Sequence, residues 1–386
     1  MWSAVRDVLA ELLPWWRAGR TAAMATVTAT FDSAPRLPGA SMLVGPDGEA
    51  VGSVSGGCVE GAVYEVAQQV MRDRTPVAQR YGVSDADALA VGLTCGGILD
   101  VFVEVVDKES FPDLDEVAAD ISEGRPVAVA TIVGHDAVDR IGRRLVVRME
   151  GDKRRAHGSL GSARADDAVT ADARGLLAQG RSATLHYGTD GQRRGEGMAV
   201  FVASYAPKPR MLVFGAIDFA TAVARLGSFL GYHVTVCDAR PVFATAARFP
   251  EADDVVVAWP HKYLAGQAEQ GRIDDRTVVC VLTHDPKFDI PLLEVALRLP
   301  GLAYVGAMGS RRTADDRHAR LRDVGLTETQ MSRLSSPIGL DLGARTPEET
   351  AVSIAAEIIA LRWGGDGRRL NAASGPIHHP FTGGDG

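Results

Sequence analysis

The chain has 386 residues, of which 46% are hydrophobic and 23% charged, a composition typical of a globular protein with two or three domains. Its 41 basic and 49 acidic side chains give a net charge of −8. This charge argues against a general nucleic-acid binder, which needs a basic surface to displace counterions from phosphates. The four cysteines are too few and too widely spaced for a disulfide framework: Cys58, Cys95, Cys237 and Cys280.

The N-terminal residues predict an amphipathic helix rather than a secretion signal, because Arg6, Asp7 and Glu11 interrupt the apolar positions. No stretch of the chain approaches the ~18 uncharged apolar residues that a membrane span requires. We therefore expect a cytoplasmic protein without stable membrane insertion.

Residues from about 19 to 105 and from about 124 to 204 look like two copies of one unit. The segment that starts at Gly19 recurs at Gly124, and the Val-Phe-Val run that starts at Val101 recurs at Val200. Alternating apolar runs and a helical-period segment predict the same elements in each copy. These are strands at 23–30, 41–44 and 99–106 with a helix at 59–71, then strands at 127–133, 145–148 and 198–204 with a helix at 165–179. We predict an internally duplicated mixed α/β domain over residues 1–205.

Two cysteines occur in the first copy and have no counterpart in the second. Cys58 follows Ser55, Gly56 and Gly57, and the corresponding residue of the second copy is Arg164. Cys95 precedes Gly96 and Gly97, and it falls opposite a cysteine-free segment at 191–196. Scaffold residues should recur in both copies, whereas residues of a functional site need not.

The surroundings of these two thiols suit a reactive site. Cys58 opens the predicted helix, where backbone N–H groups and the helix dipole favour a thiolate. The neighbouring glycines allow a bulky ligand to approach the sulfur and the backbone amides closely. The alternative is that each thiol is a small buried hydrophobe in a tight turn. Neither cysteine belongs to a C-x-x-C pair, which argues against structural zinc, and Cys237 and Cys280 lie within apolar strands and are predicted to be core residues.

The segment Ala206-Pro-Lys-Pro-Arg210 predicts a domain boundary. Beyond it strands and helices alternate, which predicts a Rossmann-like, doubly wound parallel sheet over residues 211–363. The expected strands are 211–215, 233–237, 255–258, 278–283 and 303–306, and the expected helices are 219–230, 290–298, 313–324 and 347–362. Thr346, Pro347 and Glu349 form a capping box for the last helix, and residues 364–386 are expected to be a flexible tail.

The first strand-turn-helix of this domain carries an incomplete dinucleotide fingerprint. Gly215 is its only glycine, because Ile217 stands where a second glycine would admit a pyrophosphate. Asp238, at the end of the next strand, fits the acid that binds a ribose. One hypothesis is therefore an NAD(P)-dependent oxidoreductase with His284 as proton donor, and the alternative is a retained scaffold with a defective phosphate turn.

Two other strand ends carry polar residues that could bind an anion, since ligands of such sheets bind at the carboxyl ends of strands. The candidates are His284 and Asp285 after one strand, and Gly306, Gly309, Ser310 and Arg311 after the next. The alternative is that Asp285 and Ser310 cap their helices and that the arginines are solvated.

Four motifs together resemble the XdhC/CoxI family, in the same order over residues 10–362. They are Gly52-Ser-Val-Ser-Gly-Gly-Cys-Val-Glu60, Gly92-Leu-Thr-Cys-Gly-Gly97, Tyr304-Val-Gly-Ala-Met-Gly-Ser-Arg-Arg312 and Pro337-Ile-Gly-Leu-Asp-Leu-Gly-Ala-Arg-Thr-Pro-Glu-Glu349. The chain departs from the family pattern at Ile217-Asp218, where Gly-His is usual.

The resemblance implies an accessory protein that binds molybdenum cofactor, a molybdopterin, and protects it while its terminal sulfur is installed. It would then deliver the cofactor to a molybdenum hydroxylase apoenzyme of the xanthine dehydrogenase or carbon monoxide dehydrogenase type, as a chaperone rather than a catalyst. A cysteine desulfurase and a homodimer are the expected partners. In this interpretation Cys58 and Cys95 face the molybdenum or sulfur end of the cofactor. A non-catalytic scaffold with structural thiols is a third hypothesis.

Overall fold

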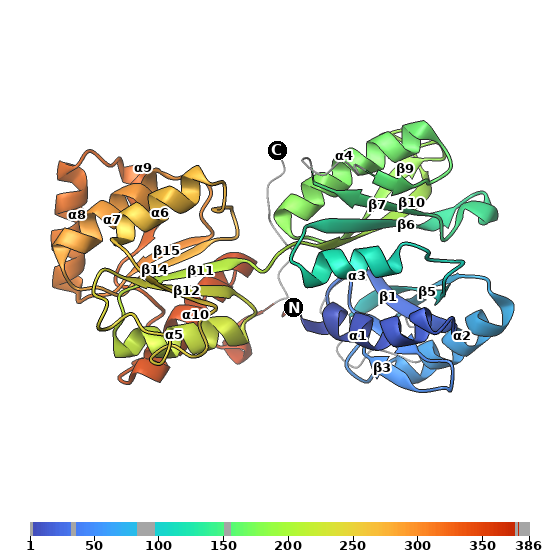
Figure 1. Cartoon of the computed structure of the whole chain (residues 1–386), viewed down its shortest axis with the longest axis horizontal. Helices are drawn as coiled ribbons and strands as arrows, with labels where there is room; N and C mark the ends of the chain where they lie inside the picture. Colours follow the sequence, from blue (N-terminus) through green and yellow to red (C-terminus); the bar gives the residue numbers. More distant parts are fainter. Residues whose placement is uncertain (1–2, 32–35, 83–96, 150–155, 375–376, 378–386) are drawn as a thin grey trace. The chain divides into compact units, whose positions relative to one another are not determined.

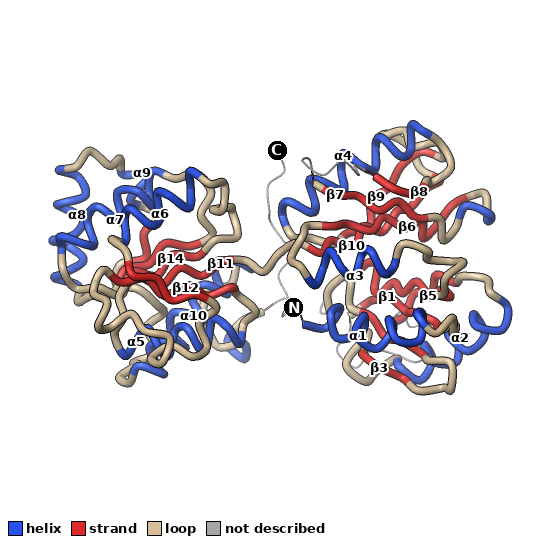
Figure 2. The backbone as a smooth tube through the Cα atoms, in the orientation of Figure 1, coloured by secondary structure: helices blue, strands red, loops and turns tan. Residues whose placement is uncertain are grey.

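The structure is a computed structural model that describes residues 3–31, 36–82, 97–149, 156–374 and 377. The chain divides into two compact units, with the boundary between Pro207 and Lys208. Each unit has its own sheets (Figures 1 and 2). Each unit also has its own hydrophobic cores. Cys95 and Gly96 lie outside the described residues.

The first unit contains two antiparallel five-stranded sheets with the same strand order. In the first sheet the order is β3 (Ala50–Gly52), β2 (Ser41–Val44), β1 (Ala22–Phe31), β5 (Ile98–Val106) and β4 (Val77–Tyr81). In the second sheet it is β8 (Ala156–Gly158), β7 (Arg144–Arg148), β6 (Val127–His135), β10 (Gly197–Tyr205) and β9 (Ala183–Gly188). The duplication visible in the sequence is therefore a duplication of structure.

One helix packs on each of these sheets. Helix α2 (Glu60–Asp73) buries Val63, Ala67 and Val70 against the first sheet, at the spacing that one face of a helix requires. Helix α4 (Ala163–Gln179) packs in the same way on the second sheet. Helices α1 (Ser3–Arg17) and α3 (Leu114–Ser122) share a further core with residues of both sheets. The two repeats thus form one unit.

The second unit is a six-stranded parallel sheet. Its order is β13 (Asp254–Val257), β12 (His233–Asp238), β11 (Arg210–Phe214), β14 (Val278–Val281), β15 (Tyr304–Ala307) and β16 (Leu334–Ser335). In chain order within the unit these are the third, second, first, fourth, fifth and sixth strands, which is the Rossmann order. The carboxyl ends of β12, β11, β14 and β15 therefore lie along one edge, where the sequence predicts a ligand.

Helices cover both faces of this sheet, as a doubly wound fold requires (Figure 1). Helices α5 (Asp218–Phe229) and α10 (Pro347–Trp363) pack on one face. Helices α6 (Pro260–Glu269), α7 (Pro286–Arg298), α8 (Arg311–Asp323) and α9 (Glu328–Met331) lie on the other. The predicted fold class, a duplicated α/β domain followed by a Rossmann-like sheet, is confirmed.

Several local features agree with the sequence and others differ. Thr346 and Glu349 form the predicted capping box of α10. The Cys237 and Cys280 side chains are fully buried, and burial raises the pKa of each thiol to about 12, as expected of core residues. Helices α3, α6 and α9 were not predicted. Single-turn helices at Val138–Arg140 and Leu370–Ala372 complete the described elements, and the second lies in the segment predicted to be a flexible tail. None of the helices built from described residues is long and apolar enough to span a bilayer.

Candidate functional site

The turn that precedes α2 is organised around the carboxylate of Glu60. This carboxylate accepts hydrogen bonds from the hydroxyls of Ser53 and Ser55, each at 2.6 Å. It also accepts the backbone N–H groups of residues 54–57, at 2.8–3.2 Å. Burial alone would raise the pKa of Glu60, but these hydrogen bonds lower it to about 2. Glu60 is therefore an anion that holds the turn in one conformation.

This arrangement corrects the prediction that backbone amides of the turn would serve a ligand. The N–H groups of Gly56 and Gly57 donate to Glu60, and those of Cys58 and Val59 donate to the buried Ser55 hydroxyl at 2.9 and 3.0 Å. Helix α2 begins at Glu60, so Cys58 lies two residues before the helix rather than at its first position. The amides of the turn are satisfied within the protein, and Ser55 acts as a structural residue.

The glycines instead keep one side of the turn open. Gly56 and Gly57 have φ values of +84° and +121°, which favour glycine, and a Cβ added at either would meet no atom within 4 Å. Both residues are exposed, while Cys58 is half-buried and packs against the core of the first sheet. A half-buried thiol therefore stands next to open space. Within the described part of the chain no group of three or more metal-ligating side chains surrounds it or occurs elsewhere.

The second repeat has the same anchor but a different side chain in place of the thiol. Asp166 corresponds to Glu60 and accepts hydrogen bonds from the Ser159 hydroxyl at 2.8 Å and from the Leu160 N–H at 2.7 Å. Arg164 corresponds to Cys58 and is exposed. The anchor carboxylate is thus part of the shared scaffold, whereas the thiol belongs to the first repeat alone.

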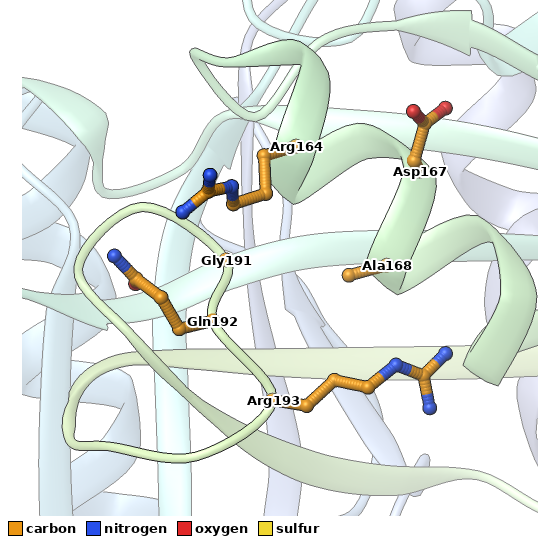
Figure 3. A pocket seen from close by; sticks show the side chains of 6 residues that line it. All are labelled: Arg164, Asp167, Ala168, Gly191, Gln192 and Arg193. Atoms are coloured by element: carbon orange, nitrogen blue, oxygen red, sulfur yellow. The ribbon is translucent and has the colours of Figure 1, made fainter.

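A hollow of about 830 Å³ lies beside Arg164. Its lining comes from α4 and from the loop that faces it, namely Arg164, Asp167, Ala168, Gly191, Gln192 and Arg193 (Figure 3). The loop lies tightly on the helix, because a Cβ at Gly191 would be 2.4 Å from the Cα of Ala165. Arg193 is held by Asp172 at 2.9 Å. The second repeat therefore has arginine side chains, Arg164 and Arg193, near the position where the first repeat has the Cys58 thiol.

Of the second predicted thiol motif, residues 92–97, the structure describes Gly97. Gly97 is buried directly before β5. Because Cys95 and Gly96 are outside the described residues, their part in the site stays a prediction.

In the second unit, Asp238 does not have the free carboxylate that ribose binding requires. Its two oxygens accept the N–H groups of Ala216 and Arg240 and both ends of the Arg240 guanidinium, at 2.8–3.0 Å. A carboxylate has about four acceptor positions, and Asp238 is only 3% exposed. Burial would raise the pKa of Asp238, but the bonds from Arg240 and Ala216 hold it below its usual range. Asp238 therefore fixes the turn after β11.

Gly215 and Gly306 are glycines that the packing of the sheet requires. A Cβ at Gly215, where φ is +109°, would lie 2.8 Å from the Thr283 side chain and 3.0 Å from its backbone N. Gly306 is inside β15, and a Cβ there would lie 2.5 Å from both Ile338 and the Tyr304 hydroxyl. Neither position could hold a side chain without displacing its neighbours. That Gly215 and Gly306 contact a cofactor stays a prediction.

The remaining predicted residues lie at the carboxyl edge of the sheet. Asp285 caps α7 by accepting the Lys287 N–H at 3.1 Å, and Ser310 caps α8 by accepting the Thr313 N–H at 3.1 Å. His284 and Arg311 are exposed. Gly309 takes a φ of +153° before α8. Asp285 and Ser310 therefore cap their helices, as the alternative expects. Ligand binding by His284, Gly309 and Arg311 stays a prediction.

A buried ion pair under this edge was not predicted. Arg317, 3% exposed, donates to Asp289 at 3.2 Å, to the Ser336 hydroxyl at 2.8 Å and to the carbonyl of Met308 at 2.7 Å. Thr283 donates to the same carboxylate. The signal in the sequence was the position of Arg317 between Ala314 and Leu321, on the buried face of α8. This network fixes the turn that carries Gly309.

Comparison with known families agrees with this architecture. The XdhC and CoxI family matches residues 15–82 and 121–188, one segment in each repeat, and the XdhC Rossmann domain matches residues 211–358. The chain belongs to the XdhC and CoxI family.

Individual relatives match along most of the chain. A protein of Bacillus subtilis (strain 168) that is named as a probable subunit of xanthine dehydrogenase is 29% identical over 346 residues, which are 88% of this chain and 93% of that protein. The molybdenum cofactor insertion chaperone PaoD of Escherichia coli (strain K12) is 24% identical over 357 residues, 92% of this chain and 88% of PaoD. A crystal structure described as a xanthine dehydrogenase from Bacillus halodurans superposes with a TM-score of 0.67 at 25% identity, covering 96% of this chain and 98% of that one.

Proposed function

We propose that this member of the XdhC and CoxI family is an accessory protein for a molybdenum hydroxylase. It would bind molybdenum cofactor as cargo, support its sulfuration and deliver it to an apoenzyme of the xanthine dehydrogenase or carbon monoxide dehydrogenase type. The names of the two relatives support the cofactor and the kind of enzyme served. A cysteine desulfurase as sulfur donor, a homodimer and a cytoplasmic location are further parts of this proposal.

The observation that carries the proposal is the Cys58 turn. Both repeats keep the anchored turn, yet only the first has a thiol at its open rim, beside Gly56 and Gly57. A thiolate is a soft ligand that suits molybdenum or sulfur, and the open glycines would admit a bulky pterin. Cys58 would contact the metal or sulfur end of the cargo, and we propose that Cys95 does so as well.

The alternative of an NAD(P)-dependent oxidoreductase has less support. The Asp238 carboxylate, which would bind the ribose, already accepts hydrogen bonds from Ala216 and Arg240. In addition, Ile217 takes the place of the second glycine of the fingerprint. We therefore favour a carrier over a dehydrogenase.

Expression in a cell that makes the cofactor, followed by metal and pterin analysis of the purified protein, tests this proposal. We expect molybdenum and pterin to be retained in equal amounts and to move to an added apo-hydroxylase. Protein that is free of both would contradict the proposal.

Alkylation of the folded protein gives a second readout. Cys58 should react in the empty protein and be protected in the loaded protein, while the buried thiols of Cys237 and Cys280 should be inert in both. Equal labelling of Cys58 with and without cofactor would argue against contact with the cargo.

A further inference from the structure

An aromatic pair, an exposed tryptophan and a half-buried phenylalanine, lies at the carboxyl edge of the parallel sheet. Trp259 follows β13 and precedes α6, and Phe288 is in the first turn of α7. Their ring centroids are 5.2 Å apart, with the planes tilted by 45°. Trp259 nonetheless keeps 46% of its surface exposed. A tryptophan that only filled the core would be far more buried.

The position of this pair is that of a ligand site. The N–H of Ala258, next to Trp259, donates to the carbonyl of Asp238 at 3.2 Å, so the tryptophan lies beside the end of β12. Ligands of doubly wound sheets bind outside the carboxyl ends of the strands. Of the two rings, Phe288 has Lys287 over it at 4.8 Å, and Trp259 is the one presented to solvent.

The charges around the pair suit a phosphate. Lys287 pairs with Asp285 at 3.1 Å, but both side chains are exposed, 63% and 47%, so this ion pair is weak and can exchange its partner. Arg240 is held rigidly by Asp238 and lies 4.6 Å over the ring of Phe243. The pKa of Asp285 is lowered by the Lys287 backbone N–H, then by the Lys287 ammonium and by Arg240. Lys287, 4.8 Å from the centre of the Phe288 ring, is therefore a cation placed beside the aromatic pair.

We propose that Trp259 stacks on a planar heteroaromatic ring and that Lys287 binds a phosphate carried by that ring system. Phe288 is a positioning residue that orients the indole. Phosphorylated pterins and nucleoside monophosphates share this chemistry. A dinucleotide is disfavoured because Asp238 is closed to its ribose. The site lies wholly within the second unit and does not depend on the Cys58 turn.

Calorimetric titration of the full-length protein with four probes tests this site: GMP, guanosine, neopterin and inorganic phosphate. We expect GMP to bind more tightly than guanosine, and inorganic phosphate to bind weakly. Trp259→Ala should weaken the binding of GMP and of either phosphate-free ring roughly ten-fold or more, which is typical when a stacking side chain is removed. Lys287→Gln should weaken GMP and leave guanosine and neopterin unchanged.

Phe229→Ala is the matched control, because Phe229 is an aromatic residue with 84% exposure at the C-terminal end of α5. It should leave every affinity unchanged, and circular dichroism checks that each variant is folded. Binding of neopterin but not guanosine would assign the ring to pterins, and the reverse would assign it to nucleobases. The proposal is overturned if no ring ligand binds at millimolar concentration, or if Trp259→Ala binds the ring ligand that the wild type takes as tightly as the wild type does. Neither result would bear on molybdenum retention through Cys58.

Discussion

The two repeats of the first unit have the same fold but different side chains at the turn before the covering helix. Each has five strands in the same order, one covering helix and a carboxylate, Glu60 or Asp166, that anchors the turn before the helix. At the rim of that turn the first repeat has Cys58 and the second has Arg164. Features kept in both copies therefore maintain the fold, and the differing position identifies the candidate site.

One glycine from each repeat makes the comparison testable. In the second repeat Gly191 has a φ of +79°, and an added Cβ would lie 2.4 Å from the Cα of Ala165. We expect Gly191→Ala to lower the free energy of unfolding by about 3 kcal/mol, because both backbone strain and a clash oppose it. Gly56→Ala, which meets only strain, should cost about 1 kcal/mol. Equal urea midpoints for the two variants would contradict the packing described for this loop.

The carboxylates of Glu60 and Asp166 should differ in how much they contribute to the free energy of unfolding. Glu60 accepts six hydrogen bonds, so Glu60→Gln should cost about 2 kcal/mol and speed hydrogen exchange of the amides of residues 54–57. Asp166→Asn disturbs two bonds and should cost about 1 kcal/mol. Unchanged exchange in Glu60→Gln would show that the anchor does not hold the turn.

The role of Glu60 should also appear in the pH dependence of the free energy of unfolding. The pKa of Glu60 is about 2 in the folded protein and 4.5 as its ordinary value. Its contribution is complete above the ordinary value and is lost as the pH falls toward the folded value. Between about pH 6 and about pH 3.5 the free energy of unfolding should fall by about 1 kcal/mol more in the wild type than in Glu60→Gln. Parallel pH profiles would rule out this role.

The smallest effects are expected at the position that differs. Arg164 is exposed, so Arg164→Ser should change the free energy of unfolding by less than about 0.5 kcal/mol. Cys58 is half-buried, and Cys58→Ser should cost less than about 1 kcal/mol. Thermal or urea unfolding measures both. A large loss in Cys58→Ser would favour the structural alternative for this thiol.

Much of the fold could be predicted because the relevant signals are local. Apolar strands alternating with helices specify the parallel sheet, and the similarity between copies specifies the duplication. The edge strands β3, β4, β8 and β9 were not predicted. Strands β3 and β8 have three residues each, too few to show a periodicity.

The site was less predictable because its partners depend on tertiary contacts. Cys58 could be singled out by its absence from the second copy. That Glu60 would take the amides of its own turn could not be seen, because a glutamate at a helix start is usually solvated. Asp238 is at the expected position, but the Arg240 side chain, two residues later, donates hydrogen bonds to its carboxylate and so blocks it from a ribose.

Molybdenum retention in a matched pair of variants tests the central claim most directly. Cys58→Ser and Arg164→Ser change equivalent positions of the two repeats and should both fold. Each would be expressed in cofactor-producing cells beside the wild type and assayed for molybdenum per protein. We expect Cys58→Ser to lose most of its molybdenum and Arg164→Ser to retain the wild-type amount. Equal retention by the two variants would contradict the assignment of the cofactor to the Cys58 turn.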